Sequence, residues 1–568
     1  MDRSIQELLE SSKLKGSRGS SMKSTMKPRV RGDRPSLSFD KKIFILLALI
    51  VSIIAWKLVT IQSNLGVYYW DIFLYLNNAL RMAHLGSSDT LYLPPLLPAI
   101  LSVFFRLGFV GEYTIFIVGG VFYILAAAGM YLLLRLRFDE IESLAGALTF
   151  ASSTLVLAWA VTGSTDIPAI SLSIWAIYFT LLAKRKDKRF YYLAFPVAMA
   201  AFLTRYTSAL IIIPILLVII MDSKPRFREI TKGIILGILL YSPFGLFFYR
   251  NLKNPLPFLG QFTETAKGSV TAINPGYNPD SLYYLRHLPE YLSALPSDNY
   301  MLIINPSSAS PSPLAYLIVA IILVGVILHI IHNRTILDGV ETRRLGVFLL
   351  LSIALIVIFG RISYALAEVL IFLWALSIYW LLKGRGLDNL DINLVMVTWF
   401  LSFLYMHSFH LVKVDRYIIP ILPALAYAMP LSIDEISQTL NLGHGRRLFS
   451  ILVMVLMLSS ATYYMWGMPH DYPIVDAERE AAQWLKTYDP NYHNKVIASD
   501  RGPAFTWYLK DYVFTRRINE NNSELFYRLF YKLKPDYYIY WSTSKPRIYG
   551  YKVIYNKNGV IIAEKIPP

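Results

Sequence analysis

Long apolar runs dominate this sequence of 568 residues and constrain its fold more than any other feature. About thirteen are present, most with the 17–25 residues that the apolar core of a bilayer requires. They cover 43–61, 113–134, 143–160, 166–183, 190–204, 206–221, 232–249, 313–331, 345–360, 365–382, 394–411, 417–433 and 447–467. The short pair around Arg205 is predicted to form two abbreviated helices. The runs predict a polytopic α-helical membrane protein with about thirteen transmembrane helices.

The composition supports this class and excludes others. Hydrophobic residues make up 55% of the chain and charged residues only 16%, whereas soluble proteins carry about 25% charged residues. A simple soluble enzyme and a disordered chain are therefore both excluded. The chain has no cysteine, which excludes disulfides, thiolate metal sites and a cysteine nucleophile.

The distribution of the basic residues indicates the topology. Residues 1–42 are rich in Lys and Arg, and further basic residues follow every second apolar run. Because cytoplasmic loops carry the excess of Lys and Arg, we expect 1–42 to be a basic disordered cytoplasmic tail. This pattern accounts for the net charge of +17 without nucleic acid as a partner. An odd number of spans then places the C-terminus outside the cytoplasm.

Three domains follow. The tail precedes a transmembrane domain, 43–468, with large outer loops at 62–112 and 250–311, and the last domain is 469–568. An amphipathic helix is predicted at 72–85 in the first loop. Helices, strands and a hairpin predict a small extracytoplasmic α/β domain at the C-terminus. The helices are expected at 477–486 and 523–534, the strands at 495–499 and 536–541, and the hairpin around Asn558–Gly559.

Ionisable residues gather at the outward ends of the spans, where a charged side chain marks a functional site by default. They are Asp71, Asp166, Arg205, His407, His410, Lys413, Asp415 and Arg416. Two carboxylates and several cations around one cavity suit an anionic substrate from which one proton is removed. Arg205 and Arg416 have no evident acidic partner in the sequence, so their removal is predicted to weaken substrate use without unfolding the protein.

Each of these residues also has a structural interpretation. Asp71 and Asp166 are compatible with helix caps, and Arg205 with a side chain that reaches toward the lipid headgroups. The spacing of His407 and His410 permits joint metal binding, although a pair of polar interface residues has the same spacing. The aromatic residues 68–70 are typical of the membrane interface.

The order of the motifs resembles that of a known family, the polyprenyl-phosphate-sugar glycosyltransferases of the GT-C fold. This family includes protein O-mannosyltransferases and the aminoarabinose transferases that modify lipid A. The resemblance rests on Trp70–Asp71 with Tyr75 and Ala79, Leu93–Pro94–Pro95–Leu96, Gly163 to Pro168, Leu203–Thr204–Arg205, and Lys413 with Arg416–Tyr417 to Pro423.

Departures from the family's patterns narrow the resemblance. Ile72 stands where many relatives carry a second acid, and Tyr92–Leu93 replace the Glu-Lys of the aminoarabinose transferases, with Asp89 the nearest acid. These differences argue against aminoarabinose as the sugar. The loop 250–311 is too short for the β-trefoil of the protein O-mannosyltransferases.

The resemblance implies an inverting glycosyltransferase in the plasma membrane. Its donor would be a polyprenyl- or dolichyl-phosphate sugar, and its acceptor a lipid, glycan or protein hydroxyl at the outer face. Asp71 would be the general base, and Asp166 would orient the sugar or the cations. The implied phosphate ligands are Arg205, Lys413 and Arg416, and the implied donor or acceptor contacts are Tyr75, Asp89, His407, His410 and Tyr417. The sequence identifies no cofactor, and a divalent metal is left open.

Two other classes share many of these features. A secondary transporter or a flippase for lipid-linked sugars also has many spans and buried charges, and a non-catalytic polysaccharide-assembly scaffold is a third alternative. Transporters place their coupling groups near the bilayer midplane, often in repeated halves. One outward cavity without an evident repeat favours the enzyme.

Overall fold

The computed structural model describes residues 41–260, 276–334, 340–385, 387, 389–443, 445–518, 523–544 and 546–567. The chain divides into two compact units, 1–38 and 39–568, and the second is described here. The predicted tail, 1–42, lies outside the described residues except for Lys41 and Lys42, with which the first described helix begins.

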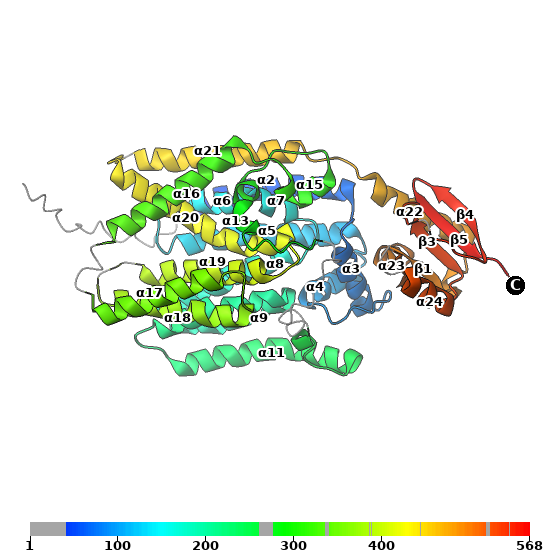
Figure 1. Cartoon of the computed structure of the whole chain (residues 1–568), viewed down its shortest axis with the longest axis horizontal. Coiled ribbons are helices and arrows are strands. Elements are labelled where there is room, and N and C mark those ends of the chain that lie inside the picture. The colour runs from blue at the N-terminus through cyan, green and yellow to red at the C-terminus, as the bar shows by residue number, and fades with distance from the viewer. Residues whose placement is uncertain are drawn as a thin grey trace, which may run out of the picture. The chain divides into compact units, whose positions relative to one another are not determined.

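Long apolar helices form the body of this unit (Figure 1). Among the described residues, nine helices are long and apolar enough to cross a membrane. They are α2 (Lys41–Leu65), α5 (Glu112–Leu134), α8 (Asp166–Arg185), α11 (Phe227–Leu252), α16 (Pro313–His332), α18 (Tyr364–Leu382), α19 (Leu390–Phe409), η5 with α20 (Asp415–Ile421 and Leu422–Thr439) and α21 (Gly445–Trp466). The prediction of a multi-pass helical fold is confirmed.

The other predicted spans are helical but shorter. They are α6 (Glu140–Ser152) with α7 (Thr154–Trp159), α9 (Tyr191–Thr204), η2 (Tyr206–Ile211) with α10 (Ile212–Ile220), and α17 (Thr342–Ile358). The run 143–160 is not one helix, because Ser153 takes an extended conformation with ψ 134° and separates α6 from α7. The count of about thirteen spans stays a prediction.

Small residues allow the helices to approach closely. A Cβ on Gly119 of α5 would lie 2.9 Å from the carbonyl oxygen of Ala160, and one on Gly233 of α11 would overlap the backbone of α9 at Tyr191. In membranes such close approach replaces the hydrophobic driving force between helices, since lipid tails are as apolar as the side chains. These contacts pack α5 against the segment that follows α7, and α11 against the start of α9.

The two long segments that are predicted to lie outside the cytoplasm contain shorter helices. The first loop holds α3 (Trp70–Ala83), which agrees with the predicted amphipathic helix, and α4 (Leu96–Arg106). The described part of the second loop holds α13 (Tyr283–Arg286), α14 (Leu288–Leu292), α15 (Tyr300–Ile304) and η3 (Pro306–Ser308). Residues 261–275 of this predicted loop lie outside the described residues. Helix α3 packs its apolar face on α4, since Ile72, Leu76 and Leu97 are buried in one cluster.

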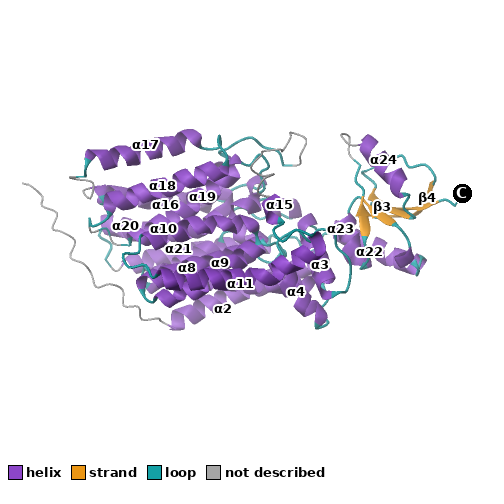
Figure 2. Ribbon diagram, turned by 90° about the horizontal axis from the view of Figure 1, so that it is seen from below, coloured by secondary structure: helices purple, strands orange, loops and turns teal. Residues whose placement is uncertain are grey.

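The C-terminal segment forms a five-stranded mixed sheet with three helices (Figure 2). Its elements are α22 (Pro473–Tyr488), β1 (Ile497–Ser499), α23 (Gly502–Leu509), β2 (Val513–Thr515), α24 (Ser523–Leu533), β3 (Tyr537–Trp541), β4 (Tyr551–Lys557) and β5 (Val560–Lys565), with strand order β2-β1-β3-β5-β4. Strand β1 runs parallel to β2 and β3, and β5 runs antiparallel to β3 and β4. The predicted hairpin is present, because Asn558 and Gly559 take the positive φ angles that its turn requires. The sequence prediction missed α23 and β2.

Candidate active site

Four charged side chains from separate segments meet at one place. Asp71 lies in the first turn of α3, Asp166 begins α8, Arg205 follows α9, and Arg416 lies in η5. Arg416 forms an ion pair with Asp71, and its Nη1 lies 3.8 Å from Oδ2 of Asp166. Arg205 pairs with Oδ1 of the same Asp166. The resulting order, Asp71–Arg416–Asp166–Arg205, joins residues up to 345 positions apart and is called the charged cluster below.

The charged cluster is buried at one end and open at the other. The side chain of Asp166 is 1% exposed, that of Arg416 7%, and that of Arg205 12%, whereas Asp71 is 34% exposed. Buried charges are tolerated only when paired, and here two carboxylates balance two guanidinium groups. Arg205 and Arg416 therefore do have acidic partners, which are not evident in the sequence because they come from distant parts of the chain.

Aromatic rings surround the two arginines. The guanidinium carbon of Arg416 lies 4.8 Å from the centre of the Tyr69 ring, 5.4 Å from Trp159 and 5.7 Å from Tyr417. The guanidinium carbon of Arg205 lies 5.4 Å from the centre of the same Tyr417 ring. Cations over aromatic faces are attracted by the ring quadrupole, so these rings hold both arginines without neutralising them. The contribution of Tyr69 was missed because residues 68–70 were interpreted as interface aromatics. That of Trp159 was missed because it lies inside the apolar run 143–160.

Two tyrosine hydroxyls at the cluster stay protonated. Burial raises the pKa of Tyr75, and the nearby charge of Asp71 raises it further. Burial likewise raises the pKa of Tyr69. The hydroxyl of Tyr75 makes a hydrogen bond with Thr165, the residue before Asp166. Tyr75 therefore contributes a neutral hydrogen-bonding group beside the carboxylates.

The local backbone explains how the side chains of the charged cluster are positioned. Both carboxylates lie in the first turn of a helix, where the helix dipole favours negative charge. Arg205 has an extended backbone that interrupts the helical run between α9 and η2, as its sequence predicts. Gly163 has φ +92°, and a Cβ there would lie 2.9 Å from Ile72. This close approach brings the segment before Asp166 against the start of α3.

Lys413 has a different set of partners. Its ammonium group donates to three backbone carbonyl oxygens at the end of α19, those of His407 at 3.0 Å, Ser408 at 2.7 Å and His410 at 2.5 Å. It also lies 5.6 Å from the centre of the Tyr284 ring. Lys413 thus satisfies carbonyl groups that a helix leaves unpaired at its C-terminus.

Of the other predicted donor or acceptor contacts, His407 lies beside Tyr417, whereas His410 and Asp89 bond to other parts of the chain. The His407 ring stacks 5.5 Å from that of Tyr417, whereas His410 Nδ1 is engaged with the backbone of Val412. Asp89 accepts a hydrogen bond of 2.7 Å from the hydroxyl of Tyr512 in the C-terminal domain. Over the described ranges, His, Asp and Glu side chains form no group of three or more that could hold a metal ion.

Asp415 connects the segment 276–311 to η5. Its Oδ1 accepts hydrogen bonds from the hydroxyls of Tyr283 and Tyr291, both at 3.1 Å, and its Oδ2 accepts one from the backbone of Ser307 at 2.7 Å. Because Asp415 precedes Arg416, this anchor fixes the segment that carries the shared guanidinium group.

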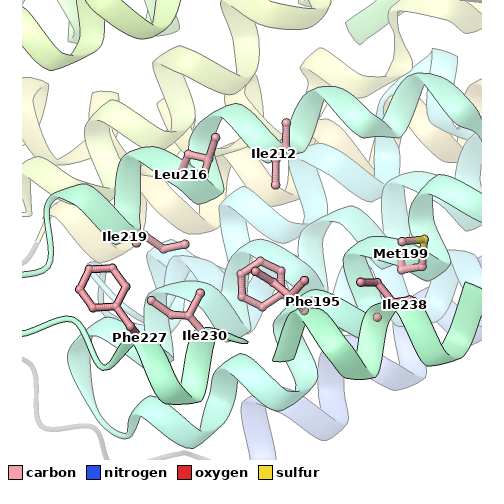
Figure 3. Close-up of a pocket in the computed structure, with 10 residues that line it drawn as sticks. Phe195, Met199, Ile212, Leu216, Ile219, Phe227, Ile230 and Ile238 are labelled. Carbon is pink, nitrogen blue, oxygen red and sulfur yellow. The ribbon is translucent and has the colours of Figure 1, made fainter. Parts of the chain in front are cut away.

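An apolar groove lies between α9, α10 and α11 (Figure 3). Its volume is about 360 Å³, and it is lined by Phe195, Met199, Ile212, Leu216, Ile219, Phe227, Ile230, Ile234, Gly237 and Ile238. In the chain, the break that carries Arg205 separates the lining residues Met199 and Ile212.

Comparisons with known proteins bear on this arrangement. Residues 93–247 match the family model of dolichyl-phosphate-mannose-protein mannosyltransferases. No curated protein matches the sequence. The structure of ArnT from Cupriavidus metallidurans bound to undecaprenyl phosphate matches with a TM-score of 0.54 and 13% identity, over 92% of this chain and 97% of that one.

A second solved structure, the oligosaccharyltransferase of Archaeoglobus fulgidus in its apo form, matches with a TM-score of 0.50 and 14% identity. The match covers 93% of this chain and 76% of that one. At such identities the likeness concerns the fold. The resemblance that the motifs indicate is thus confirmed: the chain has the multi-pass membrane fold of the GT-C glycosyltransferases.

Proposed function

We propose that this protein is an inverting membrane glycosyltransferase. It moves a sugar from a polyprenyl- or dolichyl-phosphate donor to an acceptor hydroxyl at the outer face of the plasma membrane. The charged cluster carries the proposal, because it joins a partly exposed carboxylate to buried cations at the ends of membrane helices. The fold and the matched family segment support the same chemistry, and the ArnT structure holds undecaprenyl phosphate.

Asp71 is the proposed general base. It is the most exposed member of the cluster, so an acceptor hydroxyl can reach it from the aqueous side. The carboxylate takes the hydroxyl proton while the acceptor oxygen attacks the anomeric carbon from the face opposite the phosphate. The bond between that carbon and the phosphate oxygen breaks, and the lipid phosphate leaves with the electron pair. The product therefore has inverted configuration.

Arg416 and Arg205 are the proposed phosphate ligands. When Asp71 accepts the proton, Arg416 loses one anionic partner at the moment when the leaving phosphate gains charge. The guanidinium group can then stabilise the phosphate without any change in the net charge of the site. Losing one such preorganised donor costs about 3 kcal/mol of barrier, or roughly a hundredfold in rate.

Asp166 is the proposed orienting residue for both arginines, since it pairs with each of them and is almost completely buried. Lys413 was predicted as a third phosphate ligand. Its three hydrogen bonds to carbonyl oxygens of α19 support a structural role instead. We therefore assign the phosphate to the two arginines.

The groove between α9, α10 and α11 is the proposed site for the apolar tail of the donor. Its lining is apolar throughout, and its volume of about 360 Å³ lies in the range of small-molecule sites. Arg205 follows α9 and is separated from α10 only by η2, and both helices line the groove, so we propose that the phosphate of a bound lipid lies at this break, next to the charged cluster.

A panel of purified polyprenyl-phosphate sugars tests the proposed function. Wild-type protein in lipid nanodiscs is expected to release lipid phosphate from one of them and to give a product with inverted anomeric configuration by NMR. Asp187→Asn is the matched control, since Asp187 pairs with Arg189 at an exposed loop.

Two results would reject the enzyme. One is the absence of lipid phosphate release across the panel. The other is movement of an intact lipid-linked sugar between the leaflets of a proteoliposome, which would favour the transporter.

A further inference from the structure

The C-terminal domain holds the four-residue link that precedes Asp71. Residues 66–69 connect α2 to α3, and Arg501, directly before α23, donates from Nη2 to the carbonyl oxygen of Tyr68 at 2.9 Å. The guanidinium carbon of Arg501 also lies 4.6 Å from the centre of the Tyr68 ring. Tyr68 is three residues from Asp71, so this contact acts close to the proposed base.

Arg501 is itself fixed by a buried carboxylate. Its Nε donates to Oε1 of Glu478 at 2.6 Å and its Nη2 to Oε2 at 3.2 Å. The side chain of Glu478 is fully buried and that of Arg501 is 15% exposed. Trp541 donates to the same Oε1 at 3.1 Å. A two-point pair of this kind sets the orientation of the guanidinium plane as well as its position.

Helix α23 makes a second attachment to α3, and both views place the two helices side by side (Figures 1 and 2). The side chain of Asn77 donates to the carbonyl oxygen of Pro503 at 2.9 Å. The Phe73 and Tyr508 rings meet edge to face at 5.6 Å. Trp507 is buried in the cluster that includes the apolar face of α3.

Glu112, at the start of α5, also connects the C-terminal domain to the link. It accepts hydrogen bonds from Trp507 Nε1 at 3.0 Å, from Arg479 Nη2 at 2.6 Å and from the backbone of Val67 at 3.2 Å. One carboxylate therefore connects α22, α23 and the link. These polar contacts are directional, so they specify one position of the link rather than a general association of two apolar surfaces.

We propose that the C-terminal domain positions Asp71 for proton transfer, with Arg501 as the positioning residue that acts through Tyr68. The inference rests on the proposed function, because it assigns Asp71 the role of base. Arg501 touches no reacting atom in this account. It fixes the backbone before α3, and thereby the place where Asp71 meets both Arg416 and the acceptor hydroxyl.

A charge-balanced double variant tests the inference. Glu478→Leu together with Arg501→Met removes the contact with Tyr68 and leaves no unpaired buried charge, and such replacements are often neutral for stability. Turnover is expected to fall by up to about a hundredfold, the loss that a misplacement of about 1 Å can produce. The KM for the lipid donor should change little, since the groove and both phosphate ligands are untouched.

The same double change in the Asp71→Asn background separates positioning from a general structural effect. If Arg501 acts through Asp71, the change has almost no further effect once the base is gone, because coupled sites are not additive. Glu480→Gln with Lys557→Gln is the matched control. It removes an exposed ion pair of the same domain, joined at 2.9 Å, which is not part of the contacts with α3.

Two results would overturn the inference. One is wild-type turnover in a folded double variant, and the other is an equal loss in both backgrounds. If the double variant does not fold, Arg501→Lys decides, because lysine keeps the charge beside Glu478 but lacks the planar group that reaches both partners. Arg501→Lys must then lower kcat only where Asp71 is present. If the wild-type protein itself shows no turnover of any donor, the proposed function is rejected rather than this inference.

Discussion

At the level of single residues, Arg416 links the two carboxylates of the charged cluster. It pairs with Asp71 at the open end and approaches Asp166 in the buried part. A residue in this position serves the fold and the chemistry together. The sequence predicts that Arg416 belongs to the site and that its removal leaves folding intact. Because the structure pairs Arg416 with two carboxylates, we expect its removal to destabilise the fold instead.

Arg416→Gln is expected to lower both stability and turnover. The change leaves Asp71, which is 34% exposed, without its partner, while Asp166 keeps Arg205, so the free energy of unfolding should fall by about 1–3 kcal/mol. Donor turnover should fall by about a hundredfold through loss of the phosphate ligand. Thermal unfolding in nanodiscs and release of lipid phosphate measure the two effects.

The combined change Arg416→Gln with Asp71→Asn separates these effects. It should recover part of the lost stability, since it removes the unpaired carboxylate, while turnover stays low. Arg189→Gln at an exposed pair is the control. A single Arg416→Gln variant with wild-type stability and turnover would show that the pair in the structure is not made in the membrane.

Much of the site could be predicted from motif order, and its connections could not. Trp70–Asp71, Asp166, Arg205 and Arg416 stand in the order of the family's motifs, which is visible in the sequence. The pairing of Asp71 with Arg416 spans 345 residues and depends on helix packing. The role of Tyr69 was hidden for a related reason: aromatic residues at helix ends are also typical of a lipid interface.

At the level of elements, breaks in helices place the charges. The interruption at Arg205 was predicted because the apolar run 190–221 is too long for one span and short for two. The break at Ser153 between α6 and α7 was not predicted, since the run 143–160 contains no proline or charge that would mark it. Strand β2 was missed although β1, also of three residues, was predicted. Only Val513 of β2 is buried, whereas β1 is buried throughout.

The end of α19 provides a test of the role of Lys413. Lys413→Met leaves three carbonyl oxygens without their donor, so thermal stability should decrease by about 1–3 kcal/mol. Donor turnover in the folded variant should stay near that of the wild type, because the phosphate is assigned to Arg205 and Arg416. Unchanged stability with a loss of turnover as large as that of Arg416→Gln would return Lys413 to the phosphate site.

At the level of the whole molecule, topology determines what the site can meet. The loop charges predict a cytoplasmic N-terminus and an extracytoplasmic C-terminal domain. The contacts of Arg501 and Trp507 with the first outer segment place this domain beside the charged cluster. If the predicted sidedness holds, the acceptor reaches Asp71 from outside the cytoplasm.

Single cysteine substitutions test the sidedness, because the natural chain has no cysteine. Tyr549 of the C-terminal domain is 81% exposed, so Tyr549→Cys should react with a membrane-impermeant maleimide on intact cells. Lys186, exposed in a loop predicted to be cytoplasmic, gives the matched control. Lys186→Cys should react only after the cells are permeabilised. Protection of Tyr549→Cys in intact cells would reject the predicted topology.

Donor turnover by Asp71→Asn tests the central claim most directly. Asparagine keeps the shape of the side chain and removes its basicity, so turnover should fall by about a hundredfold or more while the lipid donor still binds. Asp166→Asn should lose less, because Asp166 is assigned to the orientation of the arginines. Turnover by Asp71→Asn within a few-fold of wild type, with Asp166→Asn inactive, would reverse the two roles. Full activity in both variants would reject an enzyme at the charged cluster.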